Sequence, residues 1–242
     1  MLIASTADIL FFRIYFEKSA NYISGGSKVI KRINTLLPQA LIVIVLLNPK
    51  DRAYSWYQHQ KAHKDELALK YSFEEVLTGK DPKLESLRNH CLDPGLYLKH
   101  IKNVHNAVSF DKIIIVDGDM LKTHPAIVMN EFVDKIRKKF LKKLGYRRSK
   151  LHTNEKFLNS ITDFNYEKEI YLDAAKGKFC KKSISPGNSD FSMHHCLGSG
   201  KGRKYPRMSD KAWSYLEHFY KEPNAELAEY LRLNNFDVPA WA

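Results

Sequence analysis

Three side chains with complementary chemistry follow one another at helical spacing in one short segment. Arg52, Ser55 and His59 are three and four positions apart, so on an α-helix they lie along one face. A guanidinium, a hydroxyl and an imidazole suit an anionic ligand such as a phosphate or sulfate, and the imidazole can also transfer a proton. The alternative is a surface stripe with Tyr54 and Trp56 packed behind it, and the spacing alone leaves both interpretations open.

Two segments concentrate positive charge. Lys201, Arg203 and Lys204 surround Gly202, which lets a ligand approach the backbone closely. Residues 135–150 contain nine Lys or Arg and no acid. Each segment can bind a polyanion, and each can equally be a solvated surface.

The overall charge favours a polyanionic partner. With 39 Lys and Arg against 27 Asp and Glu, the formal net charge is +12, which suits nucleic acid, an acidic membrane surface or a sulfated polysaccharide. The sequence has no helix-turn-helix, RNP-type or zinc-finger motif, so we expect no nucleic-acid partner. The longest apolar run, residues 40–47, is shorter than the roughly 20 residues of a membrane-spanning helix, and no signal peptide is recognisable.

Alternating helices and strands have to position these residues, which predicts an α/β architecture. The branched apolar run at residues 41–47 lies between two prolines and predicts a strand buried on both faces, as does the run at residues 112–116. Asn48 is expected to cap a helix with Pro49 in its first turn, extending to about His63. A strand therefore leads directly into a helix N-terminus, where open α/β sheets bind their ligands.

The remaining predicted elements are placed by their caps and periodicity. In the first half they are a strand at residues 14–16, a helix at residues 27–37 capped by Ser27, and helical residues 84–107. In the second half they are a helix capped by Thr123, with Pro125 in its first turn and its end at Gly145, a helix starting at Ser209, and a short last helix after Pro223.

Three motifs together indicate a family. They are Phe-Glu-Lys-Ser-Ala-Asn-Tyr at residues 16–22, Asn-Pro-Lys-Asp-Arg-Ala-Tyr-Ser-Trp-Tyr-Gln-His-Gln at residues 48–60 and Lys-Gly-Arg-Lys-Tyr-Pro at residues 201–206. In order and spacing they resemble the sulfotransferase domain of heparan sulfate N-deacetylase/N-sulfotransferases, from about Tyr15 onward. The resemblance implies one sulfotransferase domain over residues 1–242, a P-loop-like parallel sheet flanked by helices, with an extra basic insertion at about residues 137–155.

The resemblance also implies roles for particular residues. The donor would be 3'-phosphoadenosine 5'-phosphosulfate, with no metal. Lys18 matches a lysine that stabilises the transferring sulfuryl group, and His59 matches a histidine of the active cleft. Ser55 matches a serine that binds the 3'-phosphate, and Arg52 lies on the same helix face. The remaining implied donor contacts are Phe179, where the family has a tryptophan, and a closing loop of Lys201, Gly202, Arg203, Lys204 and Tyr205.

The three cysteines allow one disulfide plus a buried thiol, or free thiols in a cytosolic protein. The resemblance implies a disulfide between Cys180 and Cys196, and thus an oxidising compartment, the Golgi lumen. His194 and His195 precede Cys196, but no second ligand pair at zinc spacing accompanies them, so we expect no metal site.

Two family features have no match upstream of Lys18: a Lys-Thr-Gly-Thr-Thr phosphosulfate loop and a catalytic glutamate. Residues 24–28 follow the wrong strand to replace the loop, and Glu17 neighbours Lys18 on a strand, so the two point to opposite faces. We therefore expect a domain that lacks the first strand and its loop and belongs to a longer, membrane-anchored protein. Its expected function is transfer of sulfate to the glucosamine nitrogen of heparan sulfate. The alternative is a catalytically silent fragment that binds heparan sulfate.

Overall fold

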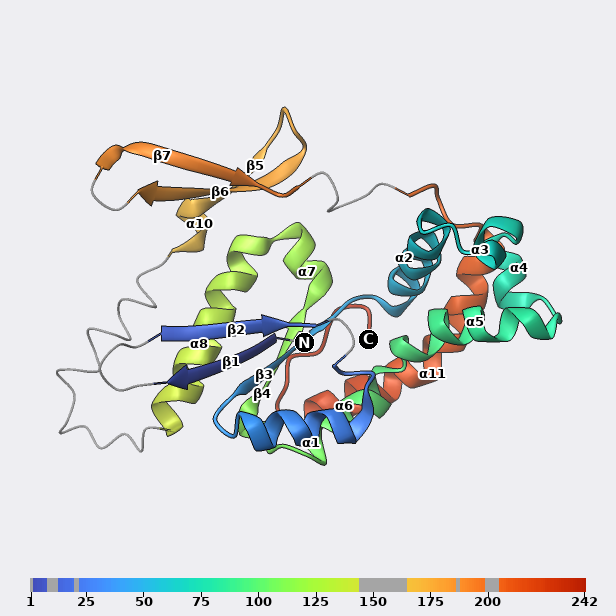
Figure 1. The fold of residues 1–242 in the computed structure, drawn as a ribbon, viewed down its shortest axis with the longest axis horizontal. Helices are drawn as coiled ribbons and strands as arrows, with labels where there is room; N and C mark the ends of the chain where they lie inside the picture. Colours follow the sequence, from blue (N-terminus) through green and yellow to red (C-terminus); the bar gives the residue numbers. More distant parts are fainter. Residues whose placement is uncertain (1, 8–12, 20–21, 144–164, 186–187, 199–204) are drawn as a thin grey trace. The chain divides into compact units, whose positions relative to one another are not determined.

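The computed structural model describes residues 2–7, 13–19, 22–143, 165–185, 188–198 and 205–242 (Figure 1). The chain divides into two compact units. One consists of Met1–Gly118 with Tyr205–Ala242, and the other of Asp119–Lys204. The single domain expected over residues 1–242 stays a prediction.

A four-stranded sheet organises the first unit. Its strands are β1 (Leu2–Ala7), β2 (Arg13–Lys18), β3 (Leu41–Leu46) and β4 (Ile113–Asp117), in the order β2-β1-β3-β4. β3 and β4 pair in parallel, whereas β1 runs antiparallel to β2 and to β3. The three strands predicted for this unit are confirmed, and the predicted α/β class with a parallel pair is confirmed with them.

Helices pack against this sheet and extend beyond it. In chain order they are α1 (Gly26–Leu36), α2 (Pro49–Ala62), α3 (Glu66–Lys70), α4 (Phe73–Thr78), α5 (Glu85–Leu92), α6 (Tyr97–His105) and α11 (Asp210–Leu233), with short 3-10 turns η1 (Pro82–Leu84), η2 (Asp93–Gly95) and η3 (Phe110–Lys112). α7 (Gly118–Thr123) follows β4 directly.

One core packs α1, α6 and the second half of α11 against the sheet. Ile44 of β3 and Ile115 of β4 lie in one cluster with Ile30 of α1, Ile101 of α6 and Leu231 of α11. Figure 1 shows these three helices running close to one another beside β3 and β4. The other face of β4 is buried too, and so is that of β3 except at Val45, which is 37% exposed.

A second core holds α2 in place. It includes Ala53 and Tyr57 of α2 together with buried residues of α4, α5 and the first half of α11. Tyr220 of α11 is 1% exposed, and its hydroxyl donates to the Leu92 carbonyl at 2.8 Å. A Cβ on Gly95 would lie 2.6 Å from that hydroxyl, so only glycine fits there. α2 is therefore fixed by packing on both α5 and α11.

Two of the predicted helix caps are wrong. Ser27 does not cap α1, because Gly25 occupies the N-cap position and no side chain bonds there. The helical character predicted for residues 84–107 is confirmed, and a 3-10 turn at Pro94 divides it into α5 and α6. Thr123 ends α7, and its hydroxyl donates back to the Asp119 carbonyl instead of capping the next helix.

The last predicted helix is also wrong. α11 continues through Pro223 to Leu233, so no separate helix begins there. The apolar contacts on both sides of the proline, at Leu216, Tyr220, Leu227 and Leu231, outweigh the hydrogen bond that the proline removes. The cap predicted at Ser209 is confirmed, since its side chain accepts from the Ala212 N–H.

The second unit joins helices to a small antiparallel sheet. Its elements are α8 (Pro125–Lys143), α10 (Tyr166–Glu169), β5 (Ile170–Asp173), β6 (Lys178–Ser185) and β7 (Asn188–Cys196), with the strands in the order β5-β6-β7. The expected basic insertion starts within α8, and from residue 144 to 155 it lies outside the described residues. Among the described helices, none has the length and apolar character needed to cross a membrane.

Candidate functional site

The junction of β3 and α2 has the predicted form. Asn48 caps α2, and its side-chain oxygen accepts from the Lys50 N–H at 3.1 Å, with Pro49 as the first helical residue. Pro49 has no N–H, and the Lys50 N–H is already bonded. An anion at this end of the helix therefore has to be bound mainly by side chains.

The three predicted residues of α2 have different surroundings. Ser55 is exposed, whereas Arg52 and His59 are half-buried. Arg52 Nη1 donates to the Cys91 carbonyl at 2.9 Å, so its guanidinium ties α2 to α5. Burial raises the pKa of the Cys91 thiol to about 12, although Arg52 acts in the opposite direction. Ser55 is thus the most accessible of the three, and the donor contact of Arg52 stays a prediction.

The His59 ring lies between two other rings of the same helix face. Its centroid is 5.6 Å from that of Trp56 and 4.2 Å from that of His63. These contacts restrict the imidazole to a narrow range of orientations, which suits a group that must position a reactant. The sequence interpretation did not include His63, although its spacing of four residues from His59 was a usable signal.

Tyr205 packs against α2 through Tyr54. Their rings meet edge to face with centroids 6.4 Å apart, and the Tyr54 hydroxyl donates to the Pro206 carbonyl at 3.0 Å. Of the predicted closing loop, Tyr205 is described, while residues 201–204 lie outside the described residues. The sequence interpretation took Tyr54 only as packing, since no local pattern indicates a contact with a residue 151 positions away.

A pocket of about 480 Å³ adjoins this contact. It is lined by Asp51, Tyr54, Tyr205, Pro206, Arg207, Met208, Asp210 and Trp213. Arg207 forms an ion pair with Asp210 at 3.0 Å, so this lining holds no second cation to neutralise the Asp51 carboxylate. Aromatic rings and a net negative lining suit a flat heterocycle better than a phosphate.

Lys18 lies at the carboxyl end of β2. β2 runs in the same direction as β3, because each is antiparallel to β1, so Lys18 and α2 belong to the same edge of the sheet. In register Lys18 pairs with Leu2, which pairs with Val43, so Lys18 lies about 10 Å across the sheet from β3. Its side chain is exposed, and its catalytic role stays a prediction.

The predicted disulfide is confirmed. Cys180 and Cys196 are cross-strand partners on β6 and β7, joined by an S–S bond of 2.10 Å. Asp173 lies close to both sulfur atoms, but these atoms are bonded to each other, so the three residues do not form a metal site while the disulfide is intact. Cys91 is the free thiol and is buried.

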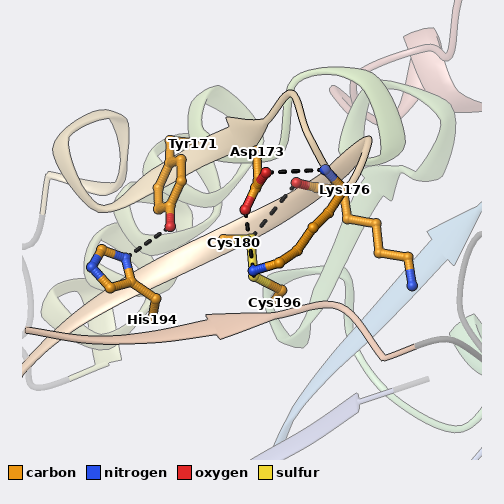
Figure 2. The surroundings of a disulfide bond; sticks show 7 residues. Tyr171, Asp173, Lys176, Cys180, His194 and Cys196 are labelled. Carbon is orange, nitrogen blue, oxygen red and sulfur yellow. Dashed lines mark hydrogen bonds and ion pairs between the residues drawn. A yellow bond between two sulfur atoms is a disulfide. The ribbon is translucent and has the colours of Figure 1, made fainter.

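Polar side chains surround this disulfide (Figure 2). The Tyr171 hydroxyl and His194 Nδ1 form a hydrogen bond of 2.8 Å between β5 and β7. The Lys176 N–H and ammonium both bind Asp173, and they hold the pKa of that carboxyl below its usual value. The hairpin is therefore braced by more than the disulfide.

Phe179 precedes the disulfide on β6 and is half-buried. Its carbonyl accepts from the Leu197 N–H at 3.1 Å, and its register partner on β5 is Leu172, which is 57% exposed. The donor contact predicted for Phe179 is an untested prediction.

Comparison with known proteins identifies the family. A family model described as "Sulfotransferase domain" matches residues 30–228. The chain belongs to the sulfotransferase domain family. The resemblance found in the sequence is thereby confirmed, and the model match includes Arg52, Ser55 and His59 but not Lys18.

Several relatives are bifunctional heparan sulfate N-deacetylase/N-sulfotransferases. Form 1 from Homo sapiens is 39% identical over 230 residues, and form 1 from Xenopus tropicalis is 38% identical over 230 residues. Each match covers 94% of this chain but 23% of the relative. The chain thus spans about a quarter of the length of these curated relatives.

A solved structure supports the sulfotransferase fold. The crystal structure of a sulfotransferase from Alicyclobacillus acidocaldarius aligns with a TM-score of 0.50 at 19% identity, covering 92% of this chain and 65% of that one. At this identity the likeness concerns the fold alone.

Proposed function

We propose that this chain is a glucosamine N-sulfotransferase domain. It binds 3'-phosphoadenosine 5'-phosphosulfate and transfers the sulfuryl group to the glucosamine nitrogen of heparan sulfate. The names of the relatives and the family match support this reaction class. The confirmed disulfide supports an oxidising compartment, for which we propose the Golgi lumen.

The observation that carries the proposal is the contact of Tyr205 and Pro206 with Tyr54. The chain enters this contact directly from the basic residues 201–204, and Tyr54 is adjacent to Ser55 on α2. Tyr205, the residue that follows this basic segment in the sequence, thus lies beside the helix that carries an exposed hydroxyl. A nucleotide with a phosphate at Ser55 would meet both groups at once.

Each residue has a defined part in the proposed binding and transfer. Ser55 and residues 201–204 bind the nucleotide phosphates, and Phe179 and Tyr205 contact the nucleotide with their rings. Arg52 donates to the Cys91 carbonyl, so it adds positive charge near the site and keeps α2 in position.

In the transfer step the amine nitrogen forms a bond to sulfur, and the bond from sulfur to the bridging phosphate oxygen breaks. The nitrogen gives up its proton to solvent water, and 3'-phosphoadenosine 5'-phosphate leaves with the bridging oxygen. Lys18 stabilises the charge that develops on the bridging oxygen, while His59 positions the amine.

Radiolabelled sulfate transfer to N-deacetylated heparosan tests the reaction, and calorimetry with 3'-phosphoadenosine 5'-phosphate tests the donor site. Ser55→Ala should weaken nucleotide binding by about 10-fold to 150-fold, the loss expected for a hydrogen bond to a charged phosphate. Ser214→Ala, at an exposed serine of α11, is the matched control and should bind normally.

Equal nucleotide affinity in wild type and Ser55→Ala would refute the donor site. If the chain is retained on heparin and binds nucleotide but transfers no sulfate, the silent heparan sulfate-binding module is the correct interpretation.

A further inference from the structure

A second pocket, of about 330 Å³, lies along one face of α11. Its lining comes from four turns of this helix, from the first turn of α2 and from the last residues of the chain. The residues are Lys50, Glu217, Tyr220, Lys221, Asn224, Ala225, Ala228, Arg232, Trp241 and Ala242. None of them has a part in the proposed reaction. Ala225 and Ala228 leave space where a larger side chain of α11 would fill the pocket.

Positive charge is in excess in this lining. Lys50, Lys221 and Arg232 line it together with two carboxylates, the Glu217 side chain and the α-carboxylate of Ala242. Lys50 forms the ion pair with Glu217, and its ammonium also lies 4.2 Å from the centroid of the Trp213 ring. Glu217 is therefore already paired with Lys50, and it does not neutralise Lys221 or Arg232.

Lys221 and Arg232 are both exposed, and neither forms an ion pair or a side-chain hydrogen bond with any described residue. They are eleven positions apart on α11, which is about three helical turns, so they lie on the same side of the helix. Asn224, between them, adds an amide donor. Because eleven residues span about 16 Å of helix axis, each of these exposed cations suits a separate oxyanion of one extended ligand.

The position of the pocket points to the acceptor. Lys50 lines the pocket, and Ser55 lies five residues further along α2, or about 7.5 Å along the helix axis. A polysaccharide acceptor that reaches a nucleotide bound at Ser55 is long enough to extend to this pocket as well. The neighbouring pocket beside Tyr205 contains Asp51 and Asp210, so it does not offer an alternative place for an anionic sugar.

We propose that this pocket on α11 is an accessory subsite for sulfate or carboxylate groups of an acidic polysaccharide. Lys221 and Arg232 bind two anionic groups of the same polysaccharide chain, Asn224 donates a hydrogen bond to the group near Lys221, and Lys50 forms the wall toward α2. The choice of an acceptor polysaccharide as the source of the anion rests on the proposed function.

Binding of a heparin octasaccharide to matched double variants tests the subsite. Lys221→Gln with Arg232→Gln removes both unpaired cations. Lys31→Gln with Arg32→Gln removes one lysine and one arginine from exposed positions of α1, so the net charge of the two proteins is equal.

The pocket variant should bind the octasaccharide about 10-fold more weakly or worse, and its salt dependence should fall by about two in slope. The α1 variant should stay within about 2-fold of wild type. Equal losses in both variants would overturn the proposal, because net charge alone would then explain binding.

Ala225→Leu obstructs the pocket without changing charge, since Ala225 is an exposed lining residue of α11. It should weaken octasaccharide binding as the charge variant does, and normal binding would overturn the proposal. The thermal unfolding of each variant checks that the fold is retained.

The indole N–H resonance of Trp241 locates the ligand, because Trp241 lines this pocket and the chain has two other tryptophans for comparison. The octasaccharide should shift this resonance, and no shift at saturation would overturn the proposal. If sodium sulfate at equal ionic strength shifts it with the same affinity per anion, the site takes any small anion and the polysaccharide subsite is wrong.

Nucleotide titrations keep the two proposals separable. Failure of nucleotide binding together with a normal octasaccharide response at Trp241 would refute the donor site and leave the subsite standing. Normal nucleotide binding without any response at Trp241 would refute the subsite alone.

Discussion

Replacing Tyr54 with phenylalanine should weaken nucleotide binding without unfolding the protein. The change removes the hydroxyl that donates to the Pro206 carbonyl at 3.0 Å and keeps the ring that contacts Tyr205. A hydrogen bond of this kind contributes about 0.5 to 1.5 kcal/mol, which corresponds to about 2-fold to 13-fold in affinity if the contact forms fully only with nucleotide bound. The bond is exposed, so the effect on folding stability should be at the low end of that range.

Calorimetry with 3'-phosphoadenosine 5'-phosphate measures this effect. The matched control is Tyr71→Phe, which removes another tyrosine hydroxyl, one that donates to Asp81 at 3.4 Å. The control should bind the nucleotide as wild type does. Wild-type affinity in Tyr54→Phe, with thermal unfolding also unchanged, would show that the contact between α2 and residues 205–206 does not support nucleotide binding.

Three further predictions concern stability. Ser209→Ala removes the N-cap of α11 and the hydrogen bond to Glu74 at 3.0 Å, so urea denaturation should show a loss of about 1 kcal/mol. Replacing Cys180 and Cys196 by serine opens a loop closed over 16 positions and should cost about 3 kcal/mol, measured by thermal unfolding against the oxidised wild type. Burial raises the pKa of the Cys91 thiol from 9.0 to about 12. The contribution of the buried neutral thiol to the free energy of unfolding is therefore complete below pH 9 and is lost as the pH rises toward 12. Cys91→Ala should remove this part of the decline in stability at alkaline pH.

The junction of β3 and α2 could be predicted from sequence because local and tertiary preferences agree there. The apolar run before Asn48 has to be buried, the asparagine caps the helix, and Pro49 fits its first turn. By contrast, Pro94 and Pro223 have opposite effects on their helices. Pro94 lies in a 3-10 turn between two helices, whereas Pro223 is accommodated within α11, and only the surrounding packing decides between these outcomes.

The sequence predicts which polar residues α2 carries, but not where their side chains point. The spacing of Arg52, Ser55 and His59 fixes a common side of the helix, but the donation of Arg52 to the Cys91 carbonyl depends on where α5 packs. Likewise, the contact of Tyr54 with Tyr205 joins residues that no local pattern relates. Such contacts depend on tertiary structure, so sequence periodicity does not indicate them.

Hydrogen exchange with and without 3'-phosphoadenosine 5'-phosphate directly tests whether α2 and the segment ending at Tyr205 hold the nucleotide. At saturation, amides in the first two turns of α2 and at Tyr205 should exchange more slowly, and Ser55→Ala should reduce this protection. Protection confined to other elements, or none at saturating nucleotide, would contradict the proposed site.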